Sequence, residues 1–177
     1  MSIPVAVRQQ VRECAVFACD YCGVNDADVG GEQTVDHFRP QSKGGTDDLA
    51  NLVYCCPRRN SYKMDYWPET SEDLHLWNPR FEPATSHFFE LEDGSLLPLT
   101  ETGLFSIRRL RLNRPPLIAY RLRKRQQAEQ ERLLILYRDL TALNEQLLVQ
   151  QRILVEEQQQ LLREQQLILQ KLLAQLD

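Results

Sequence analysis

The sequence predicts an α+β fold: a small core of two short strands and a helix, a β-hairpin extension, and a long C-terminal amphipathic helix. Three observations lead to this class. Two short β-prone runs precede a helical segment that begins with a proline. Asp93-Gly94 separates two further strand-like runs. From Leu117 to the end the chain has no glycine or proline and is rich in Leu, Gln, Glu and Arg.

The length and composition are those of one globular domain with an appendage. The chain has 177 residues, of which 42% are hydrophobic and 26% are charged. We therefore expect a core at 1–68, an α+β extension with the hairpin at 69–116, and the long helix, a candidate coiled coil, at 117–177.

The charge is unevenly distributed. A net charge of −4 argues against a uniformly basic nucleic-acid-binding protein. However, no acid interrupts the segment between Ile107 and Gln126, whose basic residues are Arg108, Arg109, Arg111, Arg114, Arg121, Arg123, Lys124 and Arg125. This basic run is either a solvated helix face or a surface for non-specific, salt-dependent contact with the DNA backbone.

Five cysteines occur without a recognisable export signal. Residues 1–18 lack a basic start followed by an unbroken apolar run, and no stretch approaches 18 apolar residues. We therefore expect a cytoplasmic protein without a membrane span. In that compartment a C-x-x-C pair is more typical of metal binding or thiol chemistry than of structural disulfides.

The N-terminal half contains the predicted core elements. Residues 4–17 suit a short helix opened by Pro4, 18–24 form a turn that brings two thiols together, and 25–31 are loop. Residues 33–36 form a short strand that places His37 at or just past its end. The remaining core elements are a polar loop at 38–48, a second strand at 52–54 and a helix from Pro57 to about Tyr66.

The second half continues with the hairpin and two helices. Residues 87–92 and 95–99 are the hairpin strands, and 105–112 suits a helix that ends before Pro115-Pro116. The long helix carries two apolar columns with a seven-residue repeat. The first is Leu140, Leu147, Leu154, Leu161 and Ile168; the second is Leu134, Leu148, Val155, Leu162, Leu169 and Leu176. This stripe predicts oligomerisation or packing through 117–177.

One group of polar residues is suited to phosphodiester hydrolysis. Asp36 and the amide oxygen of Asn60 are hard oxygen donors of the kind that Mg²⁺ or Mn²⁺ accepts. His37 can take a proton from a water, and Asn51 can hydrogen-bond the loop that positions it. Lys63 shares a helix face with Asn60 and can supply positive charge to a transition state. A metal, a base and a cation around one phosphate make a hydrolase.

The run DHFRPQSKGG, with NLV and CPRRNSYK behind it, resembles the HNH endonucleases in their Asn/Asn variant with a C-x-x-C zinc knuckle. The resemblance covers about Val11 to Pro68 and implies the ββα-metal fold. It implies that His37 is the general base, that Asp36 and Asn60 bind one divalent ion, and that Asn51 orients the histidine loop. DNA is the substrate it implies.

The zinc knuckle departs from the family pattern at one position. The family has C-x-x-C twice, but here the second half ends at Arg59, and arginine does not ligate zinc. Cys19, Cys22 and Cys56 remain as candidate Zn²⁺ ligands. The fourth position is left to water, to Cys55 or to nothing, and a pair of buried thiols without metal is an open alternative.

Three functions from different classes follow. The first is a metal-dependent DNA endonuclease that uses the residues above. The second is a catalytically weak or inactive nucleic-acid-binding module that oligomerises through its coiled coil. The third is a helical assembly protein with a secondary globular head. His75 and His87 have no partner spacing and are interpreted as packing or hydrogen-bonding residues.

Overall fold

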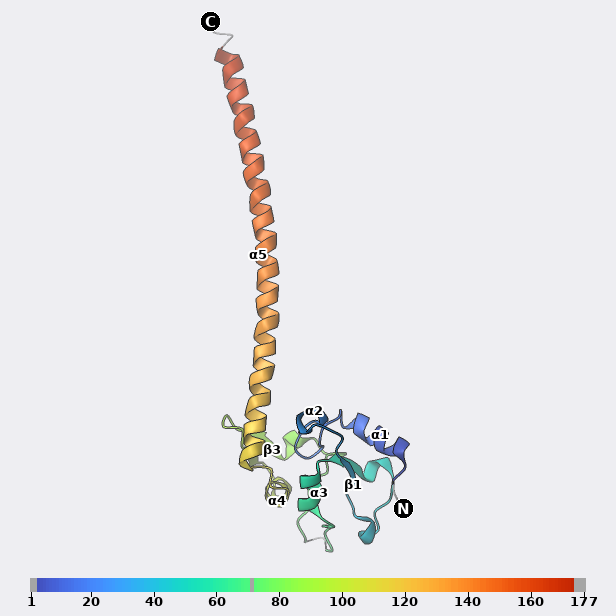
Figure 1. Cartoon of the computed structure of the whole chain (residues 1–177). Coiled ribbons are helices and arrows are strands. Elements are labelled where there is room, and N and C mark those ends of the chain that lie inside the picture. Colours follow the sequence, from blue (N-terminus) through green and yellow to red (C-terminus); the bar gives the residue numbers. More distant parts are fainter. Residues whose placement is uncertain (1–2, 71, 174–177) are drawn as a thin grey trace. The chain divides into compact units, whose positions relative to one another are not determined.

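The computed structural model describes residues 3–70 and 72–173, and its fold class is the predicted α+β class (Figure 1). Four stretches of the N-terminal half form helices or strands of the core: α1 (Val5–Cys14), β1 (Thr34–His37), β2 (Leu52–Cys55) and α3 (Pro57–Lys63). Single 3₁₀ turns lie at Gln41–Lys43, Leu49–Asn51 and Ala84–Ser86. The later elements are β3 (Phe88–Glu90), β4 (Leu96–Pro98), α4 (Glu101–Arg109) and α5 (Pro115–Leu173).

The predicted order of strand, loop, strand and helix is confirmed. β1 pairs antiparallel with β2, so that Asp36 lies opposite Val53 and His37 opposite Leu52. Pro57 occupies the first turn of α3, where its missing N–H costs nothing. α3 packs against β1. Residues at the end of β1 therefore face side chains of α3 even though more than 20 positions separate them.

The two faces of the small sheet bury different clusters. The side chains of β2 alternate, and all four of its residues are buried. Leu52 and Tyr54 pack with Val11 of α1 on one face. Val53 and Cys55 belong to the larger cluster on the other face. α1 thus covers one side of the sheet, and the extension covers the other.

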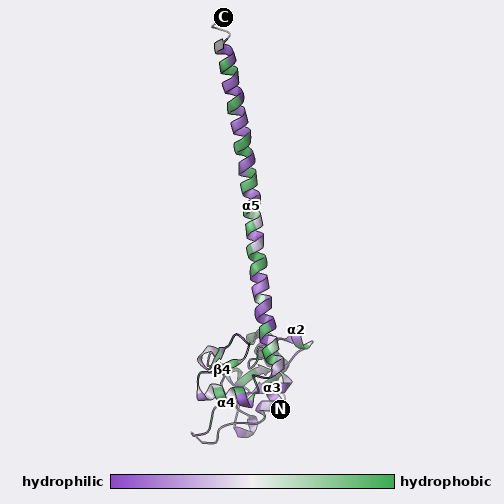
Figure 2. Ribbon diagram, turned by 90° about the vertical axis from the view of Figure 1, so that its left-hand side faces the viewer, coloured by the Kyte–Doolittle hydropathy of each residue, from purple (hydrophilic) through white to green (hydrophobic). Residues whose placement is uncertain are grey.

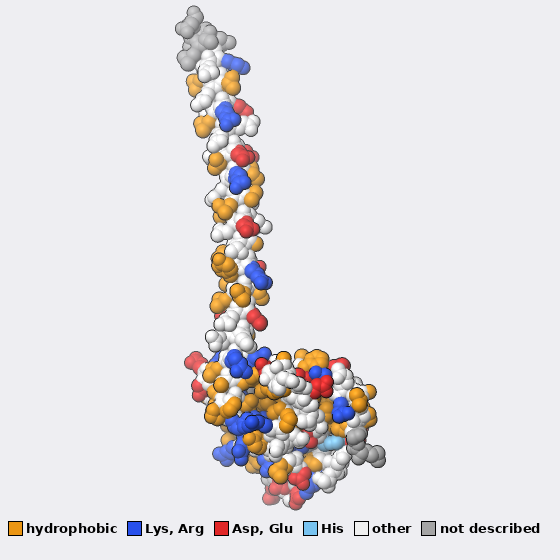
Figure 3. All heavy atoms as spheres, in the orientation of Figure 1, with side chains coloured by type: hydrophobic (Ala, Val, Ile, Leu, Met, Phe, Trp, Pro, Cys, Tyr) orange, Lys and Arg blue, Asp and Glu red, His pale blue; other side chains and the backbone are white. Residues whose placement is uncertain are grey.

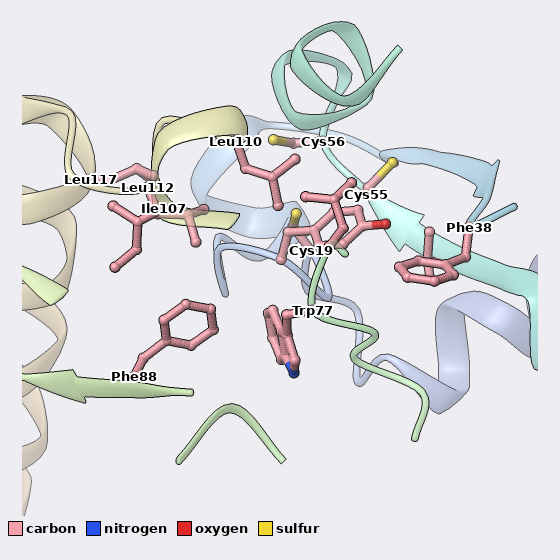
Figure 4. Close-up of a cluster of buried hydrophobic side chains, with 13 residues drawn as sticks. Cys19, Phe38, Cys55, Cys56, Trp77, Phe88, Ile107, Leu110, Leu112 and Leu117 are labelled. Carbon is pink, nitrogen blue, oxygen red and sulfur yellow. The ribbon is translucent and has the colours of Figure 1, made fainter. Parts of the chain in front are cut away.

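The larger cluster joins the core to the extension (Figure 4). Trp77 lies at its centre, in edge-to-face contact with Tyr21 at 6.4 Å and with Phe88 at 5.1 Å between ring centroids. The Trp77 backbone N–H donates to Ser106 Oγ of α4 at 2.8 Å. Leu110 is fully buried in the same cluster. The extension therefore shares one hydrophobic core with β2.

The predicted hairpin is present as β3 and β4, which pair antiparallel. Gly94 at its turn has φ +80°, a left-handed conformation that favours glycine. Helix α4 begins earlier than the sequence predicts, because the Thr100 hydroxyl accepts a hydrogen bond from Gly103 N at 3.0 Å and caps the helix.

Two other predicted boundaries are wrong. The predicted loop at 25–31 contains a one-turn helix, α2 (Asp26–Val29), whose first turn is capped by the Asn25 side chain. α3 ends at Lys63 instead of near Tyr66, because Met64 adopts a left-handed φ of +56°.

The chain divides into two compact units, the first extending to Lys124 and the second beginning at Arg125. The second consists of the remainder of α5, along which hydrophobic bands recur (Figure 2). The apolar columns are solvent-exposed there; Leu154, for example, is 57% exposed. Leu176 of the predicted stripe lies outside the described residues. Among the described helices, none combines the length and apolar character that a membrane span requires.

Candidate active site

His37 lies at the end of β1 with its ring held by a carboxylate. Its Nε2 is 2.7 Å from Asp47 Oδ1. This hydrogen bond lowers the pKa of Asp47, so the carboxylate remains ionised at neutral pH. An ionised carboxylate only accepts hydrogen bonds, so the neutral imidazole carries its proton on Nε2. The lone pair is then on Nδ1, which is the nitrogen available to accept a proton.

Asn51 holds the loop that connects the two strands. Its Oδ1 accepts from Arg39 N at 2.8 Å, and its Nδ2 donates to Thr46 O at 2.8 Å and to Arg39 O at 3.1 Å. The loop passes close to this amide because residue 45 is glycine. A Cβ at Gly45 would lie 1.8 Å from Arg39 O. The amide of Asn51 therefore holds the backbone of the loop that carries Asp47.

Lys63 joins α3 to the end of β1. Its Nζ lies 2.9 Å from Asp36 Oδ2 and donates to the backbone carbonyl of His37 at 2.7 Å. The side chain is buried, with 1% of its surface exposed. It also donates to the Met64 carbonyl at 3.4 Å, and a buried ammonium that already serves three acceptors is not available to a phosphate. Lys63 therefore holds Asp36 and the His37 backbone, which differs from the charge-supplying role that the sequence predicts.

Asn60 lies one helical turn before Lys63, on the same face of α3. Its side chain is half-buried, and among the described residues it forms no hydrogen bond. Asp36 Oδ2 is buried and, despite its ion pair, has no hydrogen bond of regular geometry within the described chain. These two oxygen donors fit a hard divalent cation, because each has capacity left for a ligand.

The structure thus links three of the five predicted catalytic residues, Asp36, His37 and Lys63, by direct contact, and Asn51 contacts the residue after His37. Lys63 contacts Asp36 and the His37 carbonyl, and Asn51 O accepts from Phe38 N at 2.7 Å, directly after His37. Asn60 is placed with them by its position on α3. Asp47 is the residue that sequence reasoning missed. The signal was weak, because one acid in a polar loop gives no indication of which imidazole it will meet.

The thiols of Cys19, Cys22 and Cys56 form a second group near α3. Their sulfur atoms all lie within 4.8 Å of one another, and Cys22 Sγ is 3.9 Å from Cys56 Sγ. Tetrahedral zinc with Zn–S bonds of about 2.3 Å holds its sulfurs about 3.8 Å apart, so the cluster fits zinc after slight contraction. Hydrogen bonds from Cys19 and Cys22 lower the pKa of Cys56, which favours one thiolate within the cluster.

The fourth ligand position has no candidate side chain. Within the described residues, no His, Asp, Glu or further Cys joins the three thiols. Figure 4 shows the sulfur of Cys55 pointing away from that of Cys56. Burial raises the pKa of Cys55, which keeps it a neutral core thiol. His87 is occupied elsewhere, with its Nδ1 2.7 Å from Thr100 Oγ1.

Arg59 has a structural role at the position where the family has a cysteine. Its guanidinium is buried, 1% exposed, and donates Nη1 hydrogen bonds to the carbonyls of Leu110 and Arg111. These carbonyls follow the last turn of α4. Arg59 therefore anchors the first turn of α3 to the segment after α4.

Comparison with known families agrees with this geometry. The family model of HNH endonucleases matches residues 19–65. The matched segment includes β1, β2 and α3, and the three-cysteine cluster fits a remnant of a zinc knuckle. No curated protein and no solved structure matches the chain.

Proposed function

We propose that this chain is a metal-dependent HNH endonuclease that hydrolyses DNA phosphodiester bonds. The observation that supports it best is the arrangement at the end of β1. A histidine oriented by Asp47 lies beside Asp36, and Asn60 extends from the neighbouring helix. All of these residues belong to the segment that matches the nuclease family.

The protein side chains have separate roles in this proposal. His37 accepts the proton of an attacking water at Nδ1, because its Nε2–H is committed to Asp47. Asn51 and Asp47 hold the histidine loop, and Lys63 holds the backbone at His37. Asp36 and Asn60 would bind Mg²⁺ or Mn²⁺. When bound, this ion would stabilise the negative charge that builds up on the phosphate.

We expect supercoiled plasmid to be nicked when Mg²⁺ or Mn²⁺ is present and to stay intact in EDTA. Asn60→Ala should remove most of this activity, because only Asp36 then remains to hold the ion. Ser61→Ala, on the exposed neighbouring position of α3, is the matched control and should cut like the wild type. Equal cutting with and without divalent ions contradicts the proposal; DNA binding without any cutting favours the inactive binding module.

Cys19, Cys22 and Cys56 would hold Zn²⁺ as a structural ion, with its fourth ligand supplied from outside the chain. Zinc would cross-link the turn after α1 to the start of α3, a region that Arg59 already anchors. Metal analysis of the same purified protein tests this assignment. Zinc that is retained by wild type and lost in Cys22→Ser supports it, and a zinc-free wild type contradicts it.

We further propose that the second unit associates with a second copy of this chain. Its leucines are half-exposed in the single chain, and long helices in water depend on burial of an apolar face. Sedimentation of the full-length chain should give the mass of an oligomer. Leu154→Lys should reduce it to a monomer, whereas Gln170→Lys, on the polar face, should not. A monomeric wild type contradicts this proposal.

A further inference from the structure

Arginines from two segments, α3 itself and the stretch between α4 and α5, gather around Tyr62 on α3. The guanidinium carbons of Arg111, Arg59 and Arg114 lie 4.8, 5.4 and 5.6 Å from the ring centroid of Tyr62. Arg114 Nη1 also donates to the Tyr62 hydroxyl at 3.1 Å. Arg58 lies four residues before Tyr62, on the same face of α3. Lys and Arg side chains gather on the visible side of the globular unit (Figure 3).

The charges of this cluster are not neutralised within the described part of the chain. Arg58, Arg111 and Arg114 form no ion pair there. Arg58 and Arg111 are exposed to solvent. Burial raises the pKa of Tyr62, but the positive charges of Arg114, Arg111 and Arg58 outweigh it and leave this pKa below the ordinary tyrosine value. The surroundings of Tyr62 therefore favour a negative charge.

A buried arginine contacts this cluster, and a cavity borders it. Arg59 ties Arg111 to α3, because its buried guanidinium donates to the Arg111 carbonyl at 3.2 Å. Arg58 and Arg114 also line a cavity of about 560 Å³. The acid at its rim, Asp28, is already bound by the Tyr120 hydroxyl at 2.9 Å, and Lys124 Nζ lies 4.0 Å away. Arg59 and Arg123 line the same cavity, so its arginine side presents several guanidinium groups to an anion, with the thiols of Cys22 and Cys56 also in its lining.

We propose that Arg58, Arg111 and Arg114 bind a backbone phosphate of the nucleic-acid substrate, at a site distinct from the phosphate that is cleaved. This inference rests on the proposed function for the identity of the ligand. Planar guanidinium forks match the oxygen pairs of a phosphate, and Arg111 and Arg114, which both lie against Tyr62, can serve the same anion. Asn60 and Lys63 lie on a different face of α3, the one toward β1. α3 would therefore lie between a bound phosphate and the reacting one.

The test uses the full-length chain with His37→Ala, so that binding is measured without cleavage. Fluorescence anisotropy with a short labelled DNA duplex in EDTA gives the affinity at several salt concentrations. Arg111→Gln and Arg114→Gln should each weaken binding roughly tenfold, as loss of a charged hydrogen bond does. Each should also reduce the slope of log affinity against log salt by about 1. Arg111→Lys should keep the slope and recover part of the affinity.

Arg8→Gln is the matched control, since it removes the same charge from an exposed position on α1. Unfolding temperatures of all variants are compared to exclude loss of structure. Equal weakening by Arg8→Gln and Arg111→Gln, or wild-type binding by both cluster variants, overturns the inference. Neither result affects plasmid nicking, which tests the proposed function separately. Inorganic phosphate that stabilises the wild type, without any binding to DNA, would assign the cluster to a free anion and overturn the nucleic-acid ligand.

Discussion

Replacement of His37 by alanine is expected to slow metal-dependent DNA cleavage by about 10²–10⁴-fold, the usual contribution of a positioned general base. The hydrogen bond between His37 Nε2 and Asp47, 2.7 Å long, leaves the lone pair of the imidazole on Nδ1, where it can accept a proton. Without the imidazole, water attacks the phosphate with no acceptor for its proton. Plasmid nicking rates at saturating Mn²⁺ measure this effect.

Two further variants make the assignment specific. Asp47→Asn should give a smaller loss, because the amide can still contact the ring but no longer selects the tautomer with a free Nδ1. His75→Ala removes an exposed histidine and should leave the rate unchanged. A His37→Ala protein that cuts at the wild-type rate would exclude His37 as the base, and an equal loss in His75→Ala would indicate a general effect.

Replacement of Lys63 by methionine should lower the free energy of unfolding by about 3–5 kcal/mol, the cost of leaving a buried charge without its partner. Lys63 is fully buried, and its ammonium lies 2.9 Å from Asp36 Oδ2 and 2.7 Å from the His37 carbonyl. Methionine fills a similar volume but leaves both oxygens without a positive partner. Urea denaturation followed by tryptophan fluorescence measures the loss.

The control for Lys63 is the ion pair between Lys43 and Glu69, which has a similar separation of 2.8 Å but is exposed. Lys43→Met should leave unfolding nearly unchanged, because water screens exposed pairs. Adding Asp36→Asn to Lys63→Met should recover part of the stability, since the unpaired charge is gone. If Lys63→Met is as stable as Lys43→Met, the buried ion pair does not hold β1 to α3.

Much of the domain can be predicted from local patterns. The two strands, the proline at the start of α3 and the Asp-Gly hairpin each depend on neighbours within a few residues, and all are present. The three-cysteine cluster is also predictable, because a C-x-x-C turn and a third thiol at the start of a helix have a recurrent geometry. The sequence did not predict the short helix α2 or the endpoint of α3. The first depends on a single cap from Asn25, and the second on the backbone of Met64.

The same distinction between local pattern and tertiary structure applies to the functional residues. The sequence by itself determined which residue types are available: a base, two hard oxygen donors, three thiols and a basic run. Only the tertiary structure decided their roles, because burial and charge pairing depend on residues distant in the chain. It paired Lys63 with Asp36, and it bound the guanidinium of Arg59 to the segment after α4. It also brought Arg111 to Tyr62, 49 positions away, where no local pattern could place it.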